Sequence, residues 1–380
     1  MTGDNFNRNA RKETAMFPKC VERLACILAE GLHLNKARAK CFAGIVIGAM
    51  ESKSVLLSEL ATRIPGNATT TSKFRRLQDF FCEVLLDFNA VAVLLMGFVG
   101  KLTNEPLTLA LDRTNWETRR NDVNILVLSI CLGDMGLPIF WIDLRMAGNS
   151  DTPCRLGLVR QFVELFGVDN IHVLVGDREF IGQEWFAGLM KEGIPFVMRL
   201  RENIYLSSKR GSKRKAIRFF YGLRPGEFRQ LNKSCGCGVK MTVCGLRTST
   251  GELLILACHG IEGSAATLAY MRRWNIETGF EKLKSHGFHM ESSRLRGDGK
   301  MELLLAALAI AMAWSYSCGA WSAKHVAPIR LKKHGRPEHS VFARGLMLLG
   351  DLLHGFAKDL KRVSLAVFAI LRAAGTALKK

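Results

Sequence analysis

Two aspartates follow apolar segments that have the composition of β-strands. Asp112 lies in LALDRTNW and Asp177 in HVLVGDREF. We expect both at strand ends, and two neighbouring strands would let both carboxylates face one point. Clustered carboxylates repel each other unless cations neutralise them, and a set of hard oxygen ligands suits Mg²⁺ or Mn²⁺. Either aspartate alone is more typical of an ordinary solvated strand end, so the metal-site interpretation depends on their combination with a third carboxylate.

A third carboxylate, Glu277, lies in a predicted helix from about Ser264 to Gly287. At about 100° per residue, one narrow strip of this helix collects four polar side chains: Tyr270, Arg273, Glu277 and Lys284. An apolar strip beside it would press the helix against a core and hold the polar strip at the rim. Glu281 shares the strip, and Arg273 and Glu277 are also spaced to form a simple surface pair.

Three carboxylates holding two metal ions about 4 Å apart would serve phosphoryl chemistry. Such ions polarise an attacking oxygen and stabilise a leaving oxygen during in-line displacement at phosphorus. The sequence therefore predicts a site that cuts or joins phosphodiesters.

The spacing of Tyr270, Arg273, Glu277 and Lys284 resembles the Y-R-E-K signature of bacterial insertion-sequence DDE transposases, the family named for insertion sequence four. Four other segments resemble the same family: LDRTNW, GNSDT at 148–152, GDREF, and KKHGRPEHSVFARGL at 332–346. The similarity covers roughly residues 107–346. The family often has a small residue two places after the second acid, where this chain has Glu179.

The resemblance implies an RNase H-like core in which Asp112, Asp177 and Glu277 bind two divalent metal ions. It implies a β-rich insertion between the second and third acids. It also implies that Tyr270, Arg273 and Lys284 grip the DNA backbone beside the scissile phosphate, where cations position and balance the phosphate charge.

The order of predicted elements indicates an α/β protein with a mixed sheet and packed helices. Three strands from Leu107 predict a meander, and two further strands alternate with helices at about 154–166 and 183–192. We predict five segments: a helical DNA-binding region at 1–100, the first part of the core at 101–200, an inserted basic β-rich segment at 201–263, the second part of the core at 264–323, and a helical C-terminal region at 324–380.

The net charge of +20 predicts a polyanionic partner, for which we favour double-stranded DNA over an acidic membrane surface. Two segments carry the candidate cations. The insertion contributes a basic cluster: Lys209, Arg210, Lys213, Arg214 and Lys215. Residues 54–81 predict a helix-turn-helix that contributes Lys73, Arg75 and Arg76, although two helices of a plain bundle would look similar.

Two features bear on the compartment. Eleven cysteines without framework spacing are typical of a reducing compartment, so we expect the cytoplasm, associated with the nucleoid. The apolar stretch Leu303–Ala323 has the length of a membrane span, but its small and polar residues favour a helix buried in protein, and we expect no membrane partner.

The leading hypothesis is a transposase that binds the inverted-repeat ends of its element, cleaves them and transfers the strands to target DNA. Joining two ends implies a dimer in the synaptic complex. Two alternatives stay open: a catalytically silent, transposase-derived DNA-binding protein, and a nuclease without strand transfer.

Overall fold

The computed structural model describes residues 3–100, 102, 105–117, 122–145, 148–207, 212–261, 263–273, 287–295, 297–333 and 335–378. The chain forms two compact units. One is helical and combines Met1–Asn104 with Phe280–Lys380; the other contains a β-sheet and spans Glu105–Gly279.

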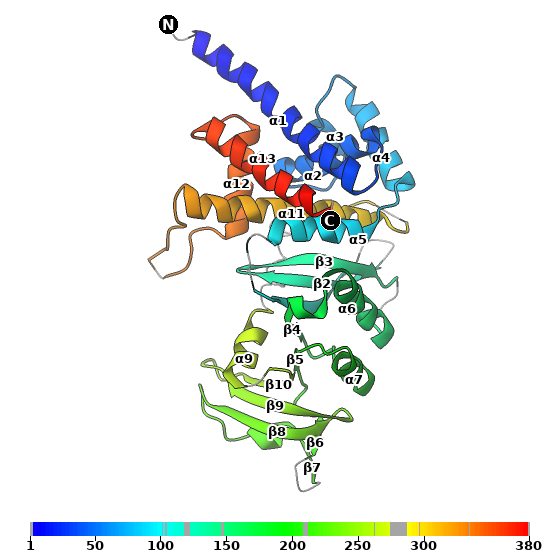
Figure 1. Ribbon diagram of the computed structural model, residues 1–380, viewed down its shortest axis with the longest axis vertical. Helices are drawn as coiled ribbons and strands as arrows, with labels where there is room; N and C mark the ends of the chain where they lie inside the picture. The colour runs from blue at the N-terminus through cyan, green and yellow to red at the C-terminus, as the bar shows by residue number, and fades with distance from the viewer. Residues whose placement is uncertain are drawn as a thin grey trace. The chain divides into compact units, whose positions relative to one another are not determined.

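The sheet unit is built on ten strands in the order β3-β2-β1-β4-β5-β10-β9-β8-β6-β7 (Figure 1). The first five run from the meander to the centre of the sheet: β1 Leu107–Glu117, β2 Asp122–Leu132, β3 Met135–Asp143, β4 Ile171–Gly176 and β5 Phe196–Arg199. β1, β2 and β3 pair antiparallel, whereas β4 is parallel to β1 and β5 is parallel to β4. This order with these directions is that of an RNase H-like core, and the predicted meander is confirmed.

The predicted β-rich segment extends the same sheet. Its described residues form one short helix, α8 Ile217–Phe220, and five strands: β6 Tyr205–Ser207, β7 Lys213–Lys215, β8 Phe228–Gly236, β9 Val239–Arg247 and β10 Leu253–His259. β10 pairs antiparallel with β5, so the segment continues the sheet from the β5 edge, and β7 is the last strand at that end.

Helices cover both faces of the central strands. α6 Thr152–Phe166 packs on β2 and β3, and α7 Gln183–Lys191 packs on α6 and β9. A short 3-10 helix, η1 Val168–Asn170, connects α6 to β4. α9 Gly263–Met271 contacts β4, β5, β9 and β10. Figure 1 shows α9 on one side of β4 and β5, with α6 and α7 on the other.

α9 is shorter than the sequence predicts. We expected one helix from about Ser264 to Gly287, whereas α9 ends at Met271. The amides of Arg272 and Arg273 bond to carbonyls three residues earlier, which tightens the last turn and ends the α-helical pattern. Residues 274–286 lie outside the described part of the chain.

In the described residues, the helical unit has five helices before the sheet unit in the chain and three long helices after it: α1 Gly3–Gly31, α2 Lys36–Ser52, α3 Leu57–Arg63, α4 Thr70–Glu83, α5 Phe88–Val99, α11 Lys300–His325, α12 Val341–Leu353 and α13 Leu360–Ala377. A short 3-10 helix, η2 Met290–Ser292, precedes α11. Thr69 caps α4 by accepting a hydrogen bond from the Ser72 amide.

α11 is the buried axis of this unit. Among the described residues, it is the one unbroken helix long and apolar enough to cross a membrane, and 94% of its most apolar window is buried in the protein. It packs against α2, α5, α12 and α13. A Cβ at Gly319 would lie 1.9 Å from the Val341 carbonyl oxygen, so the α11 and α12 backbones touch. This packing agrees with the interpretation of a buried helix.

The two compact units differ from the predicted five segments. We placed residues 264–323 in the second part of the core, whereas α11 belongs to the helical unit, because its apolar faces are covered by helices of that unit. The sheet unit ends at Gly279.

Candidate active site

Asp112 and Asp177 each follow one member of a residue pair that joins two neighbouring strands. Leu111 of β1 pairs with Gly176 of β4, and each aspartate is the next residue in the chain. Adjacent parallel strands lie about 4.8 Å apart, so the register places both acids at one point of the sheet. A Cβ at position 176 would lie 2.6 Å from Met198 Sδ, and glycine therefore permits this close packing before Asp177.

One part of the expectation for these acids was wrong. Asp177 directly follows β4, as predicted, but Asp112 lies inside β1. β1 continues to Glu117 because its second half pairs with β2, including the pair Asp112 and Val127. Asp112 is thus at the end of the pairing with β4 and in the middle of the hairpin with β2.

The Asp112 carboxylate is largely buried, with 19% of its side chain exposed. Its Oδ1 accepts a hydrogen bond of 2.8 Å from the Arg113 amide, and its Oδ2 lies 3.7 Å from Arg273 Nη1. Burial raises the pKa of Asp112 to about 6, and the negative charges of Glu179 and Asp177 act in the same direction. The Arg113 amide and the Arg273 guanidinium oppose that rise. A desolvated carboxylate of this kind favours a nearby cation.

Tyr270 and Arg273 contact the two aspartates. The Tyr270 hydroxyl donates a hydrogen bond of 3.3 Å to Asp177 Oδ1, and the Arg273 guanidinium carbon lies 5.5 Å from the centre of the Tyr270 ring. Arg272 Nη1 donates to Thr108 Oγ1 at 3.2 Å, which ties this turn to β1. The end of α9 therefore delivers two residues of the predicted signature to the two acids.

The predicted exposure of these two residues was wrong. We expected Tyr270 and Arg273 at the rim of a core, whereas they are only 2% and 4% exposed. The carboxylates explain the difference, because charge-assisted contacts replace the water that a buried hydroxyl or guanidinium would lose.

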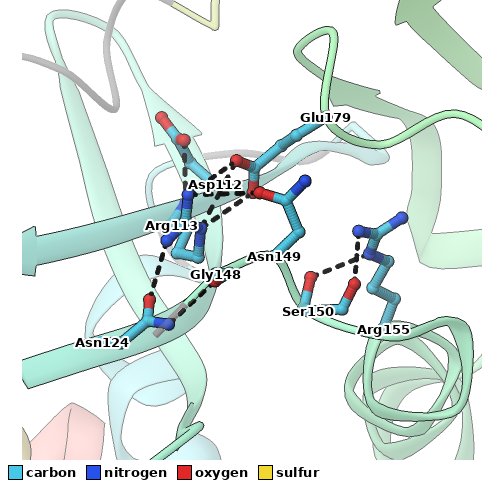
Figure 2. Close-up of polar contacts among 8 residues, drawn as sticks. All are labelled: Asp112, Arg113, Asn124, Gly148, Asn149, Ser150, Arg155 and Glu179. Carbon is cyan, nitrogen blue, oxygen red and sulfur yellow. Dashed lines mark hydrogen bonds and ion pairs between the residues drawn. The ribbon is translucent and has the colours of Figure 1, made fainter. Parts of the chain in front are cut away.

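Glu179 is held by Arg113 (Figure 2). Arg113 Nε lies 3.3 and 3.4 Å from the two carboxylate oxygens of Glu179, and Arg113 Nη2 lies 3.2 Å from Oε2. The two side chains are 18% and 21% exposed, so the pair is partly desolvated. Glu179 thus neutralises the charge of Arg113, the residue beside Asp112. The pair also links the loop after β4 to β1.

The same guanidinium reaches the loop between β3 and α6. Arg113 Nη1 donates to Asn124 Oδ1 at 3.1 Å, and Asn124 Nδ2 donates to the Gly148 carbonyl at 3.0 Å. Arg113 Nη2 also donates to Asn149 Oδ1 at 3.4 Å. Figure 2 shows these side chains converging on Arg113. The segment GNSDT therefore has a structural role next to the acids.

A buried arginine anchors the other side of this loop. Arg155 is 5% exposed, donates from Nε to Ser150 Oγ at 2.8 Å, and also donates to the Ser150 carbonyl (Figure 2). Its guanidinium carbon lies 5.0 Å from the centre of the Phe180 ring. Sequence reasoning missed Arg113, Asn124 and Arg155; the available signal was an arginine directly after the first acid.

The remaining predicted residues fall in three places. Glu277, Lys284, Lys209 and Arg210 lie outside the described residues, as does Glu281. Lys213, Arg214 and Lys215 form the exposed edge strand β7. Lys73, Arg75 and Arg76 lie on α4, where Arg75 and Arg76 are exposed and Lys73 is half-buried.

A metal site cannot be assembled from the described residues alone. Within them, no group of three or more His, Cys, Asp and Glu side chains is placed to hold an ion. Asp112 and Asp177 supply hard oxygen donors, and the predicted third donor, Glu277, is outside the described ranges. The donor chemistry of the two aspartates fits a divalent cation such as Mg²⁺.

Comparison with known proteins identifies the family. The model of the transposase DDE domain matches residues 103–314, which is more than half of the chain. No curated protein matches the sequence at a significant level. The cryo-EM structure of the piggyBac transposase synaptic complex with hairpin DNA matches at 13% identity with a TM-score of 0.44, over 95% of this chain and 85% of that chain. Because the domain match includes both aspartates and the strands that carry them, the chain belongs to the transposase DDE domain family.

Proposed function

We propose that the protein is a DNA transposase of the family named for insertion sequence four, which cleaves the ends of its own element and joins them to target DNA. The observation that carries this proposal is the shared register of Asp112 and Asp177, with Tyr270 and Arg273 in contact with them. Residues from three separate segments of the chain meet there. Two of these residues, Tyr270 and Arg273, belong to the predicted Y-R-E-K signature.

In this proposal Asp112, Asp177 and Glu277 hold two Mg²⁺ ions, for which Mn²⁺ substitutes. When bound, such ions polarise the attacking oxygen and stabilise the leaving oxygen during displacement at phosphorus. The chain supplies the positions of the carboxylates. The Tyr270 hydroxyl orients Asp177, and Arg273 balances the charge of Asp112 in the DNA-free protein.

The nucleophiles come from water and from DNA. Water attacks in the cleavage step, and the freed 3′ hydroxyl attacks in the joining step, so no covalent enzyme intermediate is needed. In this proposal Tyr270, Arg273 and Lys284 contact the DNA backbone beside the scissile phosphate. DNA binding must then expose Tyr270 and Arg273, which are 2% and 4% exposed without DNA. In the DNA-free protein, polar groups of Tyr270 and Arg273 face the aspartates instead.

DNA binding is supported by the net charge of +20. Cations that neutralise phosphates release condensed counterions, which makes binding strong and dependent on salt. The proposed contacts include the cations of α4 and of the β7 region, and the proposed assembly on DNA is a dimer that brings two element ends together. The proposed location is the cytoplasm, where the DNA substrate lies in a bacterial cell.

The test is a cleavage and joining assay with DNA that carries the sequences flanking the gene on both sides. With Mg²⁺, the wild-type protein should nick at the ends of inverted repeats and produce joined strands on a denaturing gel. Asp112→Asn should lose both products, by roughly a thousandfold or more, and still bind the ends. Asp169→Asn, an exposed acid of the same unit, is the matched control and should react like wild type.

Each other outcome selects a different function. Cleavage without joined strands would indicate a nuclease, and end binding without any cleavage would indicate a catalytically silent DNA-binding protein. Undiminished cleavage by Asp112→Asn would remove that residue from the site.

A further inference from the structure

A basic hairpin connects α11 and α12, and none of the predicted functions uses it. We define the basic hairpin as residues 330–333 and 335–338. Leu331 pairs antiparallel with Pro337, the Lys332 amide donates to the Arg336 carbonyl at 2.8 Å, and the Glu338 amide donates to the Arg330 carbonyl at 2.8 Å. The segment is thus a two-stranded ribbon with its own cross-strand hydrogen bonds.

A tight turn closes the ribbon. The Gly335 amide donates to the Lys332 carbonyl at 2.8 Å, and Gly335 has a φ of 78°, which suits glycine at this position. The described residues of the ribbon are therefore joined by backbone hydrogen bonds, although none of them belongs to the core.

The base of the basic hairpin is fixed at both ends. At the end of α11, the Val326 amide donates to the Ser322 carbonyl, and Arg362 of α13 donates to the His325 carbonyl at 2.9 Å. At the start of α12, Ser340 caps the helix by accepting from the Ala343 amide at 3.1 Å. Figure 1 shows this segment projecting from the ends of α11 and α12. The ribbon therefore projects from two helix ends that these hydrogen bonds hold in place.

The side chains of the basic hairpin alternate between its two faces. In an antiparallel ribbon, cross-strand partners and residues two apart share a face. Arg330, Lys332 and Arg336 therefore share one face with Glu338, while Leu331 and Pro337 share the other. Lys333 adds a fourth cation at the turn. The described residues of the ribbon are all exposed.

These cations have no anionic partner in the described part of the protein. The ion pairs among the described residues involve none of Arg330, Lys332, Lys333 and Arg336. Glu338 offsets one of the three positive charges on this face, and the remaining excess of positive charge favours a ligand with closely spaced negative charges. Duplex DNA carries one charge per about 1.7 Å of helix axis, and its major groove, about 12 Å wide, admits a two-stranded ribbon.

We propose that the basic hairpin is a further DNA-binding element, which contacts the phosphates of duplex DNA through the face of Arg330, Lys332 and Arg336. This inference rests on the proposed function, because it assumes a DNA substrate. The contacts are made to the backbone, so they position the DNA without selecting its sequence.

The experiment measures the affinity of the full-length protein for two duplexes, one with the flanking repeat and one of scrambled sequence, between 50 and 400 mM KCl. In the triple variant Arg330→Gln, Lys332→Gln and Arg336→Gln, we expect the slope of log K against log salt to become shallower by about 2.7, at about 0.9 per phosphate contact. Both duplexes should lose affinity to a similar extent. A charge-retaining variant, Arg330→Lys with Arg336→Lys, should keep the slope.

The matched control removes three other exposed cations of the helical unit: Lys358→Gln, Lys361→Gln and Arg372→Gln. An equal change of slope in this control would show that net charge matters and the hairpin does not, and would overturn the inference. An unchanged slope in the hairpin variant would overturn it as well. If that variant binds and cleaves as wild type does, only the hairpin inference fails; if the wild-type protein binds neither duplex, the proposed function fails too.

Discussion

The charges beside β1 and β4 and those of the basic hairpin are held in opposite ways. At the sheet, Asp112, Asp177 and Glu179 each contact a hydroxyl or guanidinium from another part of the chain. On the hairpin, the cations are exposed and their ion-pair partner is absent from the described residues. A buried charge needs an oppositely charged or hydrogen-bonding partner within the folded chain, because it has lost its contact with water. An exposed charge can instead pair with a ligand.

This difference separates the effects of substitution. Changing a residue at the sheet alters the stability of the folded protein as well as the reaction, because its partner remains buried without a hydrogen bond or ion pair. Changing a hairpin residue alters the encounter with DNA and leaves the fold intact.

The largest predicted effect is a difference in cleavage rate between variants of Asp177 and Glu179, two carboxylates that are two residues apart. Asp177→Asn should reduce cleavage by roughly a thousandfold or more, because it removes a proposed metal ligand. Glu179→Gln should reduce it only about tenfold, since Glu179 supports Arg113 and does not hold the ion in our proposal. The measurement is the single-turnover cleavage rate at saturating DNA.

Thermal unfolding provides the control for this pair. Glu179→Gln should lower stability by about 1–3 kcal/mol, because Arg113 keeps its place without its carboxylate partner. If both variants lost activity to the same extent, Glu179 would belong with the metal ligands and the distinction between the two acids would be wrong.

The second prediction concerns the stability of the metal-free protein as a function of pH. The pKa of Asp112 rises from its ordinary value of 3.8 to about 6 on folding. The folded protein therefore binds this proton more tightly than the unfolded chain, and the contribution of Asp112 to stability falls as pH rises from about 4 to 6. At about 1.4 kcal/mol per pKa unit, the loss is up to about 3 kcal/mol.

Asp112→Asn should remove this dependence. Measured in EDTA, the difference in unfolding free energy between variant and wild type should shift in favour of the variant between pH 4 and 6, then stay level to pH 8. A constant difference across that range would mean that burial does not perturb Asp112 as described.

Much of the fold could be predicted because its signals are local. The meander of β1, β2 and β3 follows from alternating strands joined by short turns, and the cap at Thr69 follows from residue type. The unit to which α11 belongs could not be predicted. A helix that is apolar on all sides must be buried, but its sequence does not say which helices cover it.

The candidate site divides in the same way. Two aspartates after apolar strands predict a shared location if the strands are parallel neighbours, as β1 and β4 are. The contacts of Tyr270 and Arg273 depend on where α9 ends over the sheet, and Arg113 and Glu179 are 66 residues apart. No spacing rule connects such positions, and their pairing emerges only from the packed structure.

The smallest predicted effect concerns β7, the basic edge strand of the sheet. Strand alternation puts Lys213 and Lys215 on one face and Arg214 on the other. If β7 contacts DNA with one face, Lys213→Gln with Lys215→Gln should make the salt slope shallower by about 1.8, while Arg214→Gln alone should leave it nearly unchanged. The reverse result would assign the Arg214 face to DNA. Cations on an edge strand also prevent pairing between sheets of separate molecules, so a variant with an unchanged slope but concentration-dependent aggregation in light scattering would assign β7 to that protective role.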